Sequence, residues 1–355
     1  MERTEYSPHK IVHHPEILSQ LRNKEHIFPL QVHLVPSNRC NQSCSFCAYR
    51  MHGYSSSQNF GIQDQIETPK LLEIIEDLAD GGCKAIQYTG GGEPLFHRDI
   101  DKAIELTFEK GMDVGMVTNG VLFTDKTLDL MSQSSWVRVS ADCFEKETYI
   151  TLRAVTEKQY DLMQANVKKL AKIKSPSTVL GIGFVITKEN YREVYQAARL
   201  FKEIGVDNIR ISAAFTNHGF SYFDGWFEEA RDEVAKTYSD LNDGTFTVFN
   251  LFDERVSDLF DGVQDYDFCP MKHLVPYVGA DSNVYTCCTL AYNDAGLIGS
   301  IQNKKFSEMW YEPETVAMMN DHSPRRNCRL PCMFESKNKF INYCITEDAI
   351  HTNFI

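Results

Sequence analysis

The residues with the clearest chemical potential are three cysteines, Cys40, Cys44 and Cys47, which follow a short apolar segment with the spacing CxxxCxxC. Thiolate sulfur is a soft ligand that suits iron–sulfur clusters, and three thiolates on one tight loop can hold three corners of a [4Fe–4S] cube. The fourth iron is then left without a protein ligand and is open to an organic cofactor. A zinc knuckle that lacks one ligand, or three unrelated cysteines, are the alternative interpretations.

A second group of cysteines lies toward the C-terminal end of the chain: Cys269, Cys287, Cys288, Cys328, Cys332 and Cys344. Two apolar runs flank Ala-Asp-Ser-Asn between residues 275 and 288, which predicts a β-hairpin with a cysteine at each end. Such a hairpin brings distant cysteines together. Zinc is the main alternative here, because four thiolates bind it tetrahedrally. The remaining two, Cys83 and Cys143, are expected to be small buried apolar residues.

The composition excludes several classes of protein. The chain has 355 residues, 43% of them apolar, and lacks an uncharged apolar stretch long enough for a membrane span. Residues 1–10 are polar and do not resemble a signal peptide, so we expect a cytoplasmic protein whose eleven cysteines serve mainly as metal ligands. The net charge of −13 argues against binding of duplex nucleic acid, although a nucleotide substrate remains open.

The hydrophobic pattern predicts a regular alternation of helices and strands. Strands are expected at 31–37, 85–89, 113–118, 136–140, 179–186 and 208–212, and helices at 69–79, 99–109, 122–132, 160–173 and 190–204. This alternation is typical of βα units on a parallel sheet, in which functional sites form at the C-terminal ends of the strands.

Polar and small residues follow several of these strands at the point where each one ends. The run Gly90-Gly-Gly-Glu93 follows the second strand, where glycines let the backbone approach a ligand closely and adopt positive φ. Asn119 ends the third strand, and Ser140 and Asp142 end the fourth. The short side chains of Ser140 and Asp142 can bind ribose hydroxyls, with helix N-capping as the alternative role.

Together, the CxxxCxxC loop and the Gly91-Gly-Glu93 element resemble the radical S-adenosylmethionine (SAM) superfamily. The resemblance implies an α/β fold, a partial (β/α)6 radical-SAM barrel, in which the open iron chelates SAM. It further implies that cofactor-binding residues match the family at these positions: Gly91, Gly92 and Glu93 at the SAM amino group, Asn119 in a Thr-Asn-Gly turn, Ser140 and Asp142 at the ribose, Arg153 at the SAM carboxylate, and Phe46 and Tyr49 at the adenine. Ala154 follows Arg153 where relatives usually have glycine, and Phe46 and Tyr49 could equally be packing residues.

The C-terminal cysteines resemble the SPASM/twitch extension of radical-SAM enzymes. Because a full SPASM domain generally uses at least seven cysteines, the resemblance implies one auxiliary [4Fe–4S] cluster bound by Cys269, Cys287, Cys328 and Cys332. Cys288 and Cys344 are the alternative ligands. The expected organisation is an N-terminal extension packed on the barrel (1–30), the barrel (31–215), a linker or cap (216–260) and a small auxiliary-cluster domain (261–355). Within the linker or cap, the pattern predicts a helix at 228–238 that leads into a strand near 246–249.

The resemblance implies an enzyme that cleaves SAM reductively to a 5′-deoxyadenosyl radical, which abstracts a hydrogen atom from a substrate. We expect oxidation of a small polar substrate, such as an aminocyclitol, sugar or amino-acid-like molecule, with the auxiliary cluster accepting an electron. Isomerisation, epimerisation or maturation of a peptide or a modified nucleotide is the alternative, and a non-catalytic iron–sulfur electron carrier is the alternative from another class. An electron donor such as flavodoxin or ferredoxin is the implied partner, and no catalytic acid or base is assigned.

Overall fold

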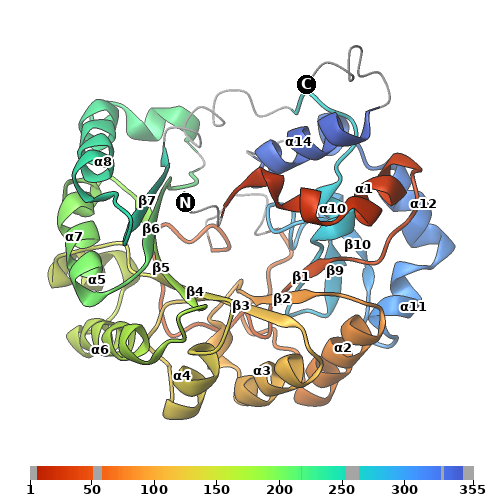
Figure 1. Ribbon diagram of the computed structural model, residues 1–355, viewed down its shortest axis with the longest axis horizontal. Helices are drawn as coiled ribbons and strands as arrows, with labels where there is room; N and C mark the ends of the chain where they lie inside the picture. The colour runs from red at the N-terminus through yellow and green to blue at the C-terminus, as the bar shows by residue number, and fades with distance from the viewer. Residues whose placement is uncertain (1–5, 51–57, 217, 253–263, 329–331, 347–355) are drawn as a thin grey trace.

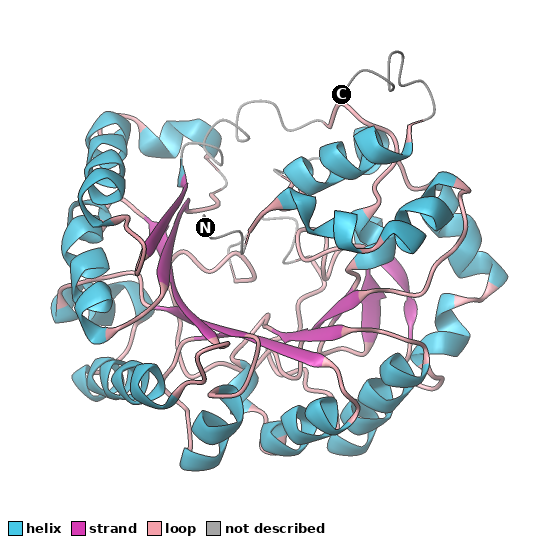
Figure 2. Cartoon of the chain, viewed as in Figure 1, coloured by secondary structure: helices cyan, strands magenta, loops and turns pink. Residues whose placement is uncertain are grey.

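A single curved sheet organises the chain. The computed structural model describes residues 6–50, 58–216, 218–252, 264–328 and 332–346. Ten strands lie in the order β10-β9-β8-β1-β2-β3-β4-β5-β6-β7. Strands β1 to β7 are parallel to their neighbours and β8 is parallel to β1, whereas β9 and β10 are joined in antiparallel fashion. The helices from α2 to α8 cover the outer face of the sheet (Figures 1 and 2).

The strands are short, as is typical of βα folds. They are β1 (Gln31–Leu34), β2 (Ala85–Tyr88), β3 (Asp113–Thr118), β4 (Trp136–Ser140), β5 (Val179–Ile186), β6 (Asn208–Ala213), β7 (Thr247–Leu251), β8 (Tyr277–Val278), β9 (Asn283–Tyr285) and β10 (Leu297–Ser300). The helices are α1 (Pro15–Arg22), α2 (Thr68–Asp80), α3 (Ile100–Glu109), α4 (Asp125–Met131), α5 (Lys146–Arg153), α6 (Glu157–Ile173), α7 (Val194–Ile204), α8 (Phe227–Leu241), α10 (Met271–Leu274), α11 (Phe306–Trp310), α12 (Pro313–Asp321), α13 (Pro324–Asn327) and α14 (Glu335–Ile345). Short 3₁₀ helices are η1 (Pro8–His13), η3 (Pro94–Phe96), η4 (Tyr191–Glu193), η5 (Gly219–Phe223) and η6 (Asp294–Gly296).

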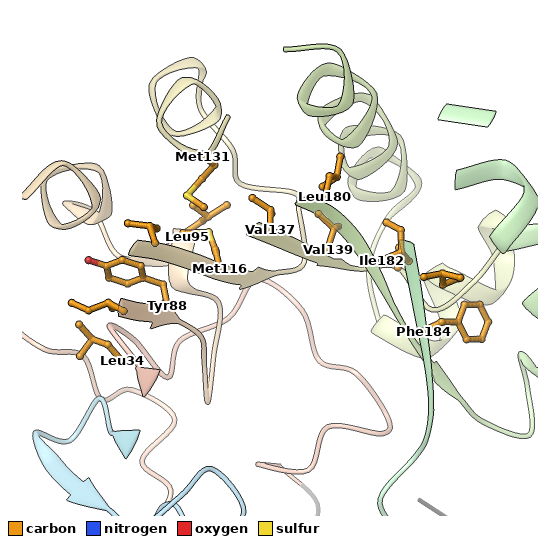
Figure 3. Packing of buried hydrophobic residues seen from close by; sticks show 14 of the residues in the cluster. Leu34, Tyr88, Leu95, Met116, Met131, Val137, Val139, Leu180, Ile182 and Phe184 are labelled. Carbon is orange, nitrogen blue, oxygen red and sulfur yellow. The ribbon is translucent and has the colours of Figure 1, made fainter. Parts of the chain in front are cut away.

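The main core lies between the sheet and its outer helices. Successive side chains of a strand point to opposite faces, so every second residue packs under the helices. Val137 and Val139 of β4 and Leu180 and Ile182 of β5 are almost fully buried in this layer (Figure 3). The intervening residues face the inside of the curved sheet, and this inner face is where functional side chains are available.

The six expected parallel strands and the five expected helices are present, close to their predicted bounds. The helix and strand predicted within the linker or cap at 216–260 are present as α8 and β7. The prediction that this region is a linker is wrong in part, because β7 pairs in parallel with β6 and so extends the sheet. The dense aromatic residues of this region are core residues: Phe223 and Trp226 are buried against the same hydrophobic layer. Residues 253–263 of the region lie outside the described residues.

The C-terminal segment continues the same sheet. The predicted hairpin is present as β8 and β9, and β8 pairs with β1 through His33 opposite Tyr277. The N-terminal segment packs mainly on this C-terminal part, since Ile11 and Leu21 share a small core with Ile341 of α14. The domain boundaries proposed from the sequence therefore fall within one continuous sheet. No helix among the described residues is long and apolar enough to cross a membrane.

Candidate cofactor and metal site

A cavity of about 330 Å³ opens where the C-terminal ends of the parallel strands meet the cysteine loop. The thiols of Cys40, Cys44 and Cys47 belong to its lining. So do all nine residues that the sequence assigned to SAM: Phe46, Tyr49, Gly91, Gly92, Glu93, Asn119, Ser140, Asp142 and Arg153. The structure therefore brings into one cavity residues that are scattered over more than a hundred positions of the sequence.

Gly91 and Gly92 allow the cysteine loop to approach the end of β2. A Cβ atom on Gly92 would lie 2.3 Å from the carbonyl oxygen of Arg39, and one on Gly91 would lie 2.4 Å from the side chain of Asn38. The backbone N–H of Glu93 donates to the same Arg39 carbonyl at 2.9 Å. The expectation of positive φ in this glycine run is wrong, because none of the three glycines adopts it. Their small size serves the close packing of the protein's own backbone.

Glu93 joins the ends of two neighbouring strands. Its carboxylate accepts hydrogen bonds from Thr118 Oγ1 at 2.6 Å and from the backbone N–H groups of Asn119 at 2.7 Å and Leu95 at 3.1 Å. Burial raises the pKa of Glu93, and these three donors oppose that rise. Glu93 thus fixes the Thr-Asn-Gly turn in place, and its contact with the SAM amino group stays a prediction.

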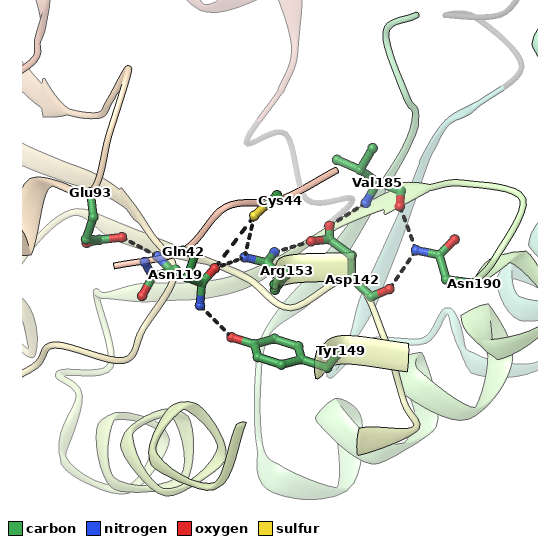
Figure 4. A network of polar contacts seen from close by, with 9 residues as sticks. All are labelled: Gln42, Cys44, Glu93, Asn119, Asp142, Tyr149, Arg153, Val185 and Asn190. Carbon is green, nitrogen blue, oxygen red and sulfur yellow. Dashed lines mark hydrogen bonds and ion pairs between the residues drawn. The ribbon is translucent and has the colours of Figure 1, made fainter. Parts of the chain in front are cut away.

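Arg153 and Asp142 form a buried ion pair beside the cysteine loop (Figure 4). Asp142 also accepts a hydrogen bond from the Val185 backbone N–H at 2.7 Å. On the other side, Arg153 Nη1 donates to Gln42 Oε1 at 2.6 Å, and Gln42 lies between the ligating cysteines. The capping alternative for Asp142 is wrong, because helix α5 begins after Glu145.

Arg153 retains one buried polar atom that suits a ligand. Its Nε has no hydrogen-bond partner among the described residues, although the side chain is only 3% exposed and lines the cavity. Unpaired buried donors are costly, so this atom favours an acceptor in the cavity. The SAM carboxylate is such an acceptor, which makes the expected role of Arg153 compatible with its ion pair.

The loop thiols are suited to a buried cluster. Burial raises the pKa of Cys40 to about 11, with a further contribution from the Glu93 carboxylate. Burial also raises the pKa of Cys44, while the Arg153 guanidinium opposes it. Such thiols stay protonated until a metal displaces the proton. Among the residues that the structure describes, no group of three or more His, Cys, Asp or Glu side chains is placed so that it could hold a single metal ion.

The two predicted adenine-side aromatics differ in their surroundings. Phe46 lies 5.9 Å from the Arg153 guanidinium carbon. Tyr49 packs on Phe60 with ring centroids 5.5 Å apart, and its hydroxyl lies 3.1 Å from the hydroxyl of Tyr277 in β8. Tyr49 therefore links the cysteine loop to the C-terminal hairpin, and contact of either ring with adenine stays a prediction.

The C-terminal cysteines gather around Asn338, a fully buried residue of α14. The Cys269 thiol donates to Asn338 Oδ1 at 3.5 Å, and Asn338 Nδ2 lies 3.8 Å from Cys332 Sγ. Burial raises the pKa of Cys287 well above its usual range, and the nearby thiols of Cys288, Cys332 and Cys328 raise it further. The four predicted auxiliary ligands are thus electrostatic neighbours.

Cys344, one of the two alternative ligands, has different surroundings. It lies on α14 opposite α1, where partial burial raises the pKa of its thiol and the charge of Arg22 opposes that rise. The neighbours of Cys288 are Cys287, Tyr49 and Tyr277. The isolated cysteines Cys83 and Cys143 are buried, as expected.

Sequence reasoning missed several residues that line the cavity, including Gln42, Arg210 and Met333. The position of Gln42 could have been predicted, since any residue between two ligating cysteines must lie near the cluster. The positions of Arg210 and Met333 could not, because only the curvature of the sheet and the return of the C-terminal segment bring them there.

A parallel βα sheet with this cysteine loop and cavity defines a SAM-dependent iron–sulfur enzyme. The model of the Radical SAM superfamily matches residues 34–237, more than half of the chain, and the chain belongs to this superfamily. The enzymes of this superfamily use a [4Fe–4S] cluster together with SAM, and the cavity residues fit both groups.

Curated relatives are similar over part of the chain. A tungsten-containing aldehyde ferredoxin oxidoreductase cofactor-modifying protein of Pyrococcus furiosus is 26% identical over 51% of this chain and 50% of its own length. An S-adenosylmethionine-dependent nucleotide dehydratase of Lacinutrix mariniflava is 29% identical over 43% of this chain and 32% of its own. A probable GTP 3′,8-cyclase of Metallosphaera sedula is 26% identical, covering 56% and 60%. The chain spans between 32% and 60% of the length of these three relatives.

Solved structures extend the likeness of fold to the C-terminal part. Streptococcus suis SuiB bound to S-adenosylmethionine has a TM-score of 0.62 at 15% identity, covering 90% of this chain and 75% of that one. Native anSMEcpe with bound AdoMet has a TM-score of 0.59 at 16% identity, covering 89% and 96%. Because 90% coverage exceeds the reach of the superfamily match, the likeness of fold extends beyond residue 237 into the C-terminal part.

Replacing Gly92 by alanine tests the close approach of the cysteine loop. The added Cβ overlaps the Arg39 carbonyl, and overpacking of this kind costs about 1–3 kcal/mol. We expect Gly92→Ala to lower the melting temperature and weaken SAM binding, measured by thermal unfolding and equilibrium dialysis. Gly244→Ala is the matched control, since no atom lies within 4 Å of its added Cβ. Equal melting temperatures for the two variants would contradict the packing argument.

Replacing Asp142 by asparagine tests the buried ion pair. The change keeps the shape but leaves the Arg153 cation without its carboxylate, which costs about 3–5 kcal/mol for a buried pair. We expect a marked loss of stability in denaturant titrations. The control is Asp125→Asn, which removes the carboxylate of an exposed pair with Lys169 and should leave the midpoint unchanged. If Asp142→Asn is as stable as the control, Asp142 is not a structural partner of Arg153.

Proposed function

We propose that this enzyme cleaves SAM reductively and abstracts a hydrogen atom from a small polar substrate held inside the curved sheet, with oxidation as the net reaction. The observation that carries the proposal is the single cavity that contains the three loop cysteines together with every residue assigned to SAM. An electron carrier without a catalytic role would not need this cavity. A flavodoxin or ferredoxin is the proposed source of the electron.

Different residues of the cavity would bind the cluster and the separate parts of SAM. Cys40, Cys44 and Cys47 would ligate the cluster, and the end of β2 at Gly91–Glu93 would take the SAM amino group. Arg153 Nε would take the carboxylate, and Ser140 would take the ribose. When bound, the cluster and SAM supply a 5′-deoxyadenosyl radical that removes hydrogen from a substrate within van der Waals reach. The surrounding aromatic side chains exclude water from this volume.

The proposed role of Asp142 differs from the one predicted from the sequence. The sequence assigned it to the ribose, but both its carboxylate oxygens already have partners in Arg153 and the Val185 N–H. A carboxylate has further lone pairs, so a ribose hydroxyl remains compatible. Its first task, however, is to hold Arg153.

We also propose that Cys269, Cys287, Cys328 and Cys332 ligate one auxiliary [4Fe–4S] cluster. Asn338 contacts two of these sulfurs, and the Tyr266 hydroxyl donates to Cys332 Sγ at 3.5 Å. Hydrogen bonds to ligating sulfurs are typical of the surroundings that tune iron–sulfur clusters. Met333, next to Cys332, lines the SAM cavity, which supports a role for this group as the acceptor of the electron that a substrate radical would lose.

A nucleotide substrate is the second candidate. It is supported by the names of two curated relatives, a nucleotide dehydratase and a GTP 3′,8-cyclase. In that case the reaction would be a dehydration, cyclisation or other rearrangement, without net oxidation.

Metal content tests both cluster assignments. Two clusters predict about eight irons per chain after anaerobic reconstitution. The triple variant Cys40→Ala, Cys44→Ala and Cys47→Ala should lose about half of this iron and all reductive cleavage of SAM, measured by iron analysis and by release of 5′-deoxyadenosine. Cys332→Ala should lose about the other half while SAM is still cleaved.

The matched control is Cys344→Ala, since the charge that acts on the Cys344 thiol is that of Arg22, which also donates a hydrogen bond to the Cys344 carbonyl at 2.8 Å. It should keep about eight irons. A zinc content of one with four irons in the unmodified protein would refute the auxiliary cluster and leave the SAM site intact.

Product mass tests the net oxidation. A substrate is recognised by its stimulation of 5′-deoxyadenosine release, and its product is then weighed by mass spectrometry after turnover in deuterated water. We expect one 5′-deoxyadenosine per product and a product that lacks two hydrogens. A product with the formula of the substrate, apart from exchanged hydrogen, would replace oxidation by isomerisation or epimerisation.

A further inference from the structure

Four basic side chains from distant parts of the chain meet inside the curved sheet. They are His33 of β1, Arg138 of β4, Arg210 of β6 and Lys337 of α14, which together we call the inner basic cluster. The electrostatic influence of Lys337 and Arg138 on His33, and of Arg210 on Lys337, places them near one another.

The strand periodicity explains why these side chains face inward. Their sequence neighbours on both sides, such as Val137 and Val139 around Arg138, are buried under the outer helices. Residues between them therefore point to the inner face. His33 and Arg210 follow the same rule on β1 and β6, where their neighbours also belong to the outer core.

Arg138 and Arg210 both lie next to Gly183 of β5. The side chain of Arg138 passes over it, with Cδ and Nε 3.5 and 3.7 Å from where a Cβ would stand. Gly183 is paired in register with Arg210 on the next strand. Arg210 also lines the SAM cavity, so the inner basic cluster is continuous with the site of hydrogen abstraction.

Two cations of the cluster, Arg138 and Lys337, have no ion-pair partner among the described residues, although Asp113 lines the same cavity as Lys337. Burial lowers the pKa of His33 to about 3, and the cations of Lys337 and Arg138 lower it further. Burial, Lys10 and Arg210 lower the pKa of Lys337, and the Cys288 thiol is the one group that opposes them.

A second observation also indicates a ligand. His33 is only 7% exposed, and its Nδ1 has no hydrogen-bond partner among the described residues. A buried polar atom without a partner is costly unless a ligand satisfies it, and so are two neighbouring cations, Arg138 and Lys337, that have no carboxylate partner among the described residues. The whole chain has a net charge of −13, so a local concentration of positive charge favours the binding of a negatively charged ligand here.

We propose that the inner basic cluster binds an oxyanion of the substrate, a phosphate or a carboxylate, through Arg138, Arg210 and Lys337. The anionic end would lie deep inside the sheet, and the carbon that loses hydrogen would lie toward the SAM cavity. This inference rests on the proposed function for its meaning in turnover, but binding of the anion itself does not require SAM cleavage.

The experiment titrates the reconstituted holoenzyme with inorganic phosphate, pyrophosphate and succinate, and with neutral inositol as the uncharged probe, in a calorimeter. We expect saturable binding of at least one anion and none of inositol. Arg138→Gln and Lys337→Gln should each weaken that binding about tenfold or more, because each removes one charge-assisted hydrogen bond. Lys339→Gln is the matched control for α14, since Lys339 is exposed and already paired with Asp265 and Glu335. Arg199→Gln is the matched control for arginine, since the side chain of Arg199 on α7 is exposed.

Each outcome decides the matter. Binding of phosphate or pyrophosphate alone assigns a phosphorylated substrate, and binding of succinate alone assigns a carboxylate. Absence of anion binding by unmodified holoenzyme overturns the proposal, as does binding that is weakened equally by Lys339→Gln. If a variant does not fold, the titration of the unmodified protein still decides. An enzyme that cleaves SAM but binds no anion refutes only this inference, whereas anion binding without SAM cleavage refutes only the proposed function.

Discussion

The buried guanidinium of Arg153 is the constraint on which the site depends. A charge that is 3% exposed must be compensated, and Asp142 compensates it. The same side chain reaches Gln42, and its backbone carbonyl accepts from the Ser43 N–H at 3.0 Å. One cation therefore fixes the cysteine loop relative to the ends of β4 and β5. The irregular loop that carries the three cysteines acquires a defined position because the buried Arg153 is hydrogen-bonded to it.

The arrangement of charge follows a similar logic on a larger scale. The chain is acidic overall, whereas His33, Arg138 and Lys337 lie near one another inside the sheet, and neither Arg138 nor Lys337 forms an ion pair with a carboxylate among the described residues. A cavity of low dielectric strengthens every such interaction, so a negatively charged molecule is attracted more strongly inside than at the surface. The net negative charge of the chain in turn opposes non-specific binding of nucleic acid, and this combination favours small anionic molecules over polyanions.

Much of the barrel could be predicted because the residues that determine each strand or helix lie within that element and at its two ends. The strands β3, β4 and β5 have the predicted bounds, since each is a short apolar run bordered by turn residues. The helix and strand that became α8 and β7 were also predicted, but their place in the sheet was not, because the local pattern does not show that β7 pairs with β6. The Asp142–Arg153 pair was not foreseen either. Both residues were assigned to SAM from the resemblance, and only the folded chain shows that they first satisfy each other. The inner basic cluster lay beyond reach for the same reason, as its members are separated by 70 residues or more.

The hydrogen-bond ladder between β1 and β8 makes the two cysteine groups parts of one rigid unit. Strand β1 leads directly into the loop of Cys40, and β8 lies between Cys269 and Cys287. The Val35 N–H donates to the Val278 carbonyl at 2.9 Å, and the hydroxyls of Tyr49 and Tyr277 meet just beyond. A displacement of the C-terminal thiols must therefore be transmitted through this ladder to the SAM cavity. Since paired strands in a buried sheet slip only in whole steps of register, the separation of the two groups is fixed. Transfer of an electron between such groups depends steeply on their separation, so a common sheet is the simplest way to keep that separation constant through turnover.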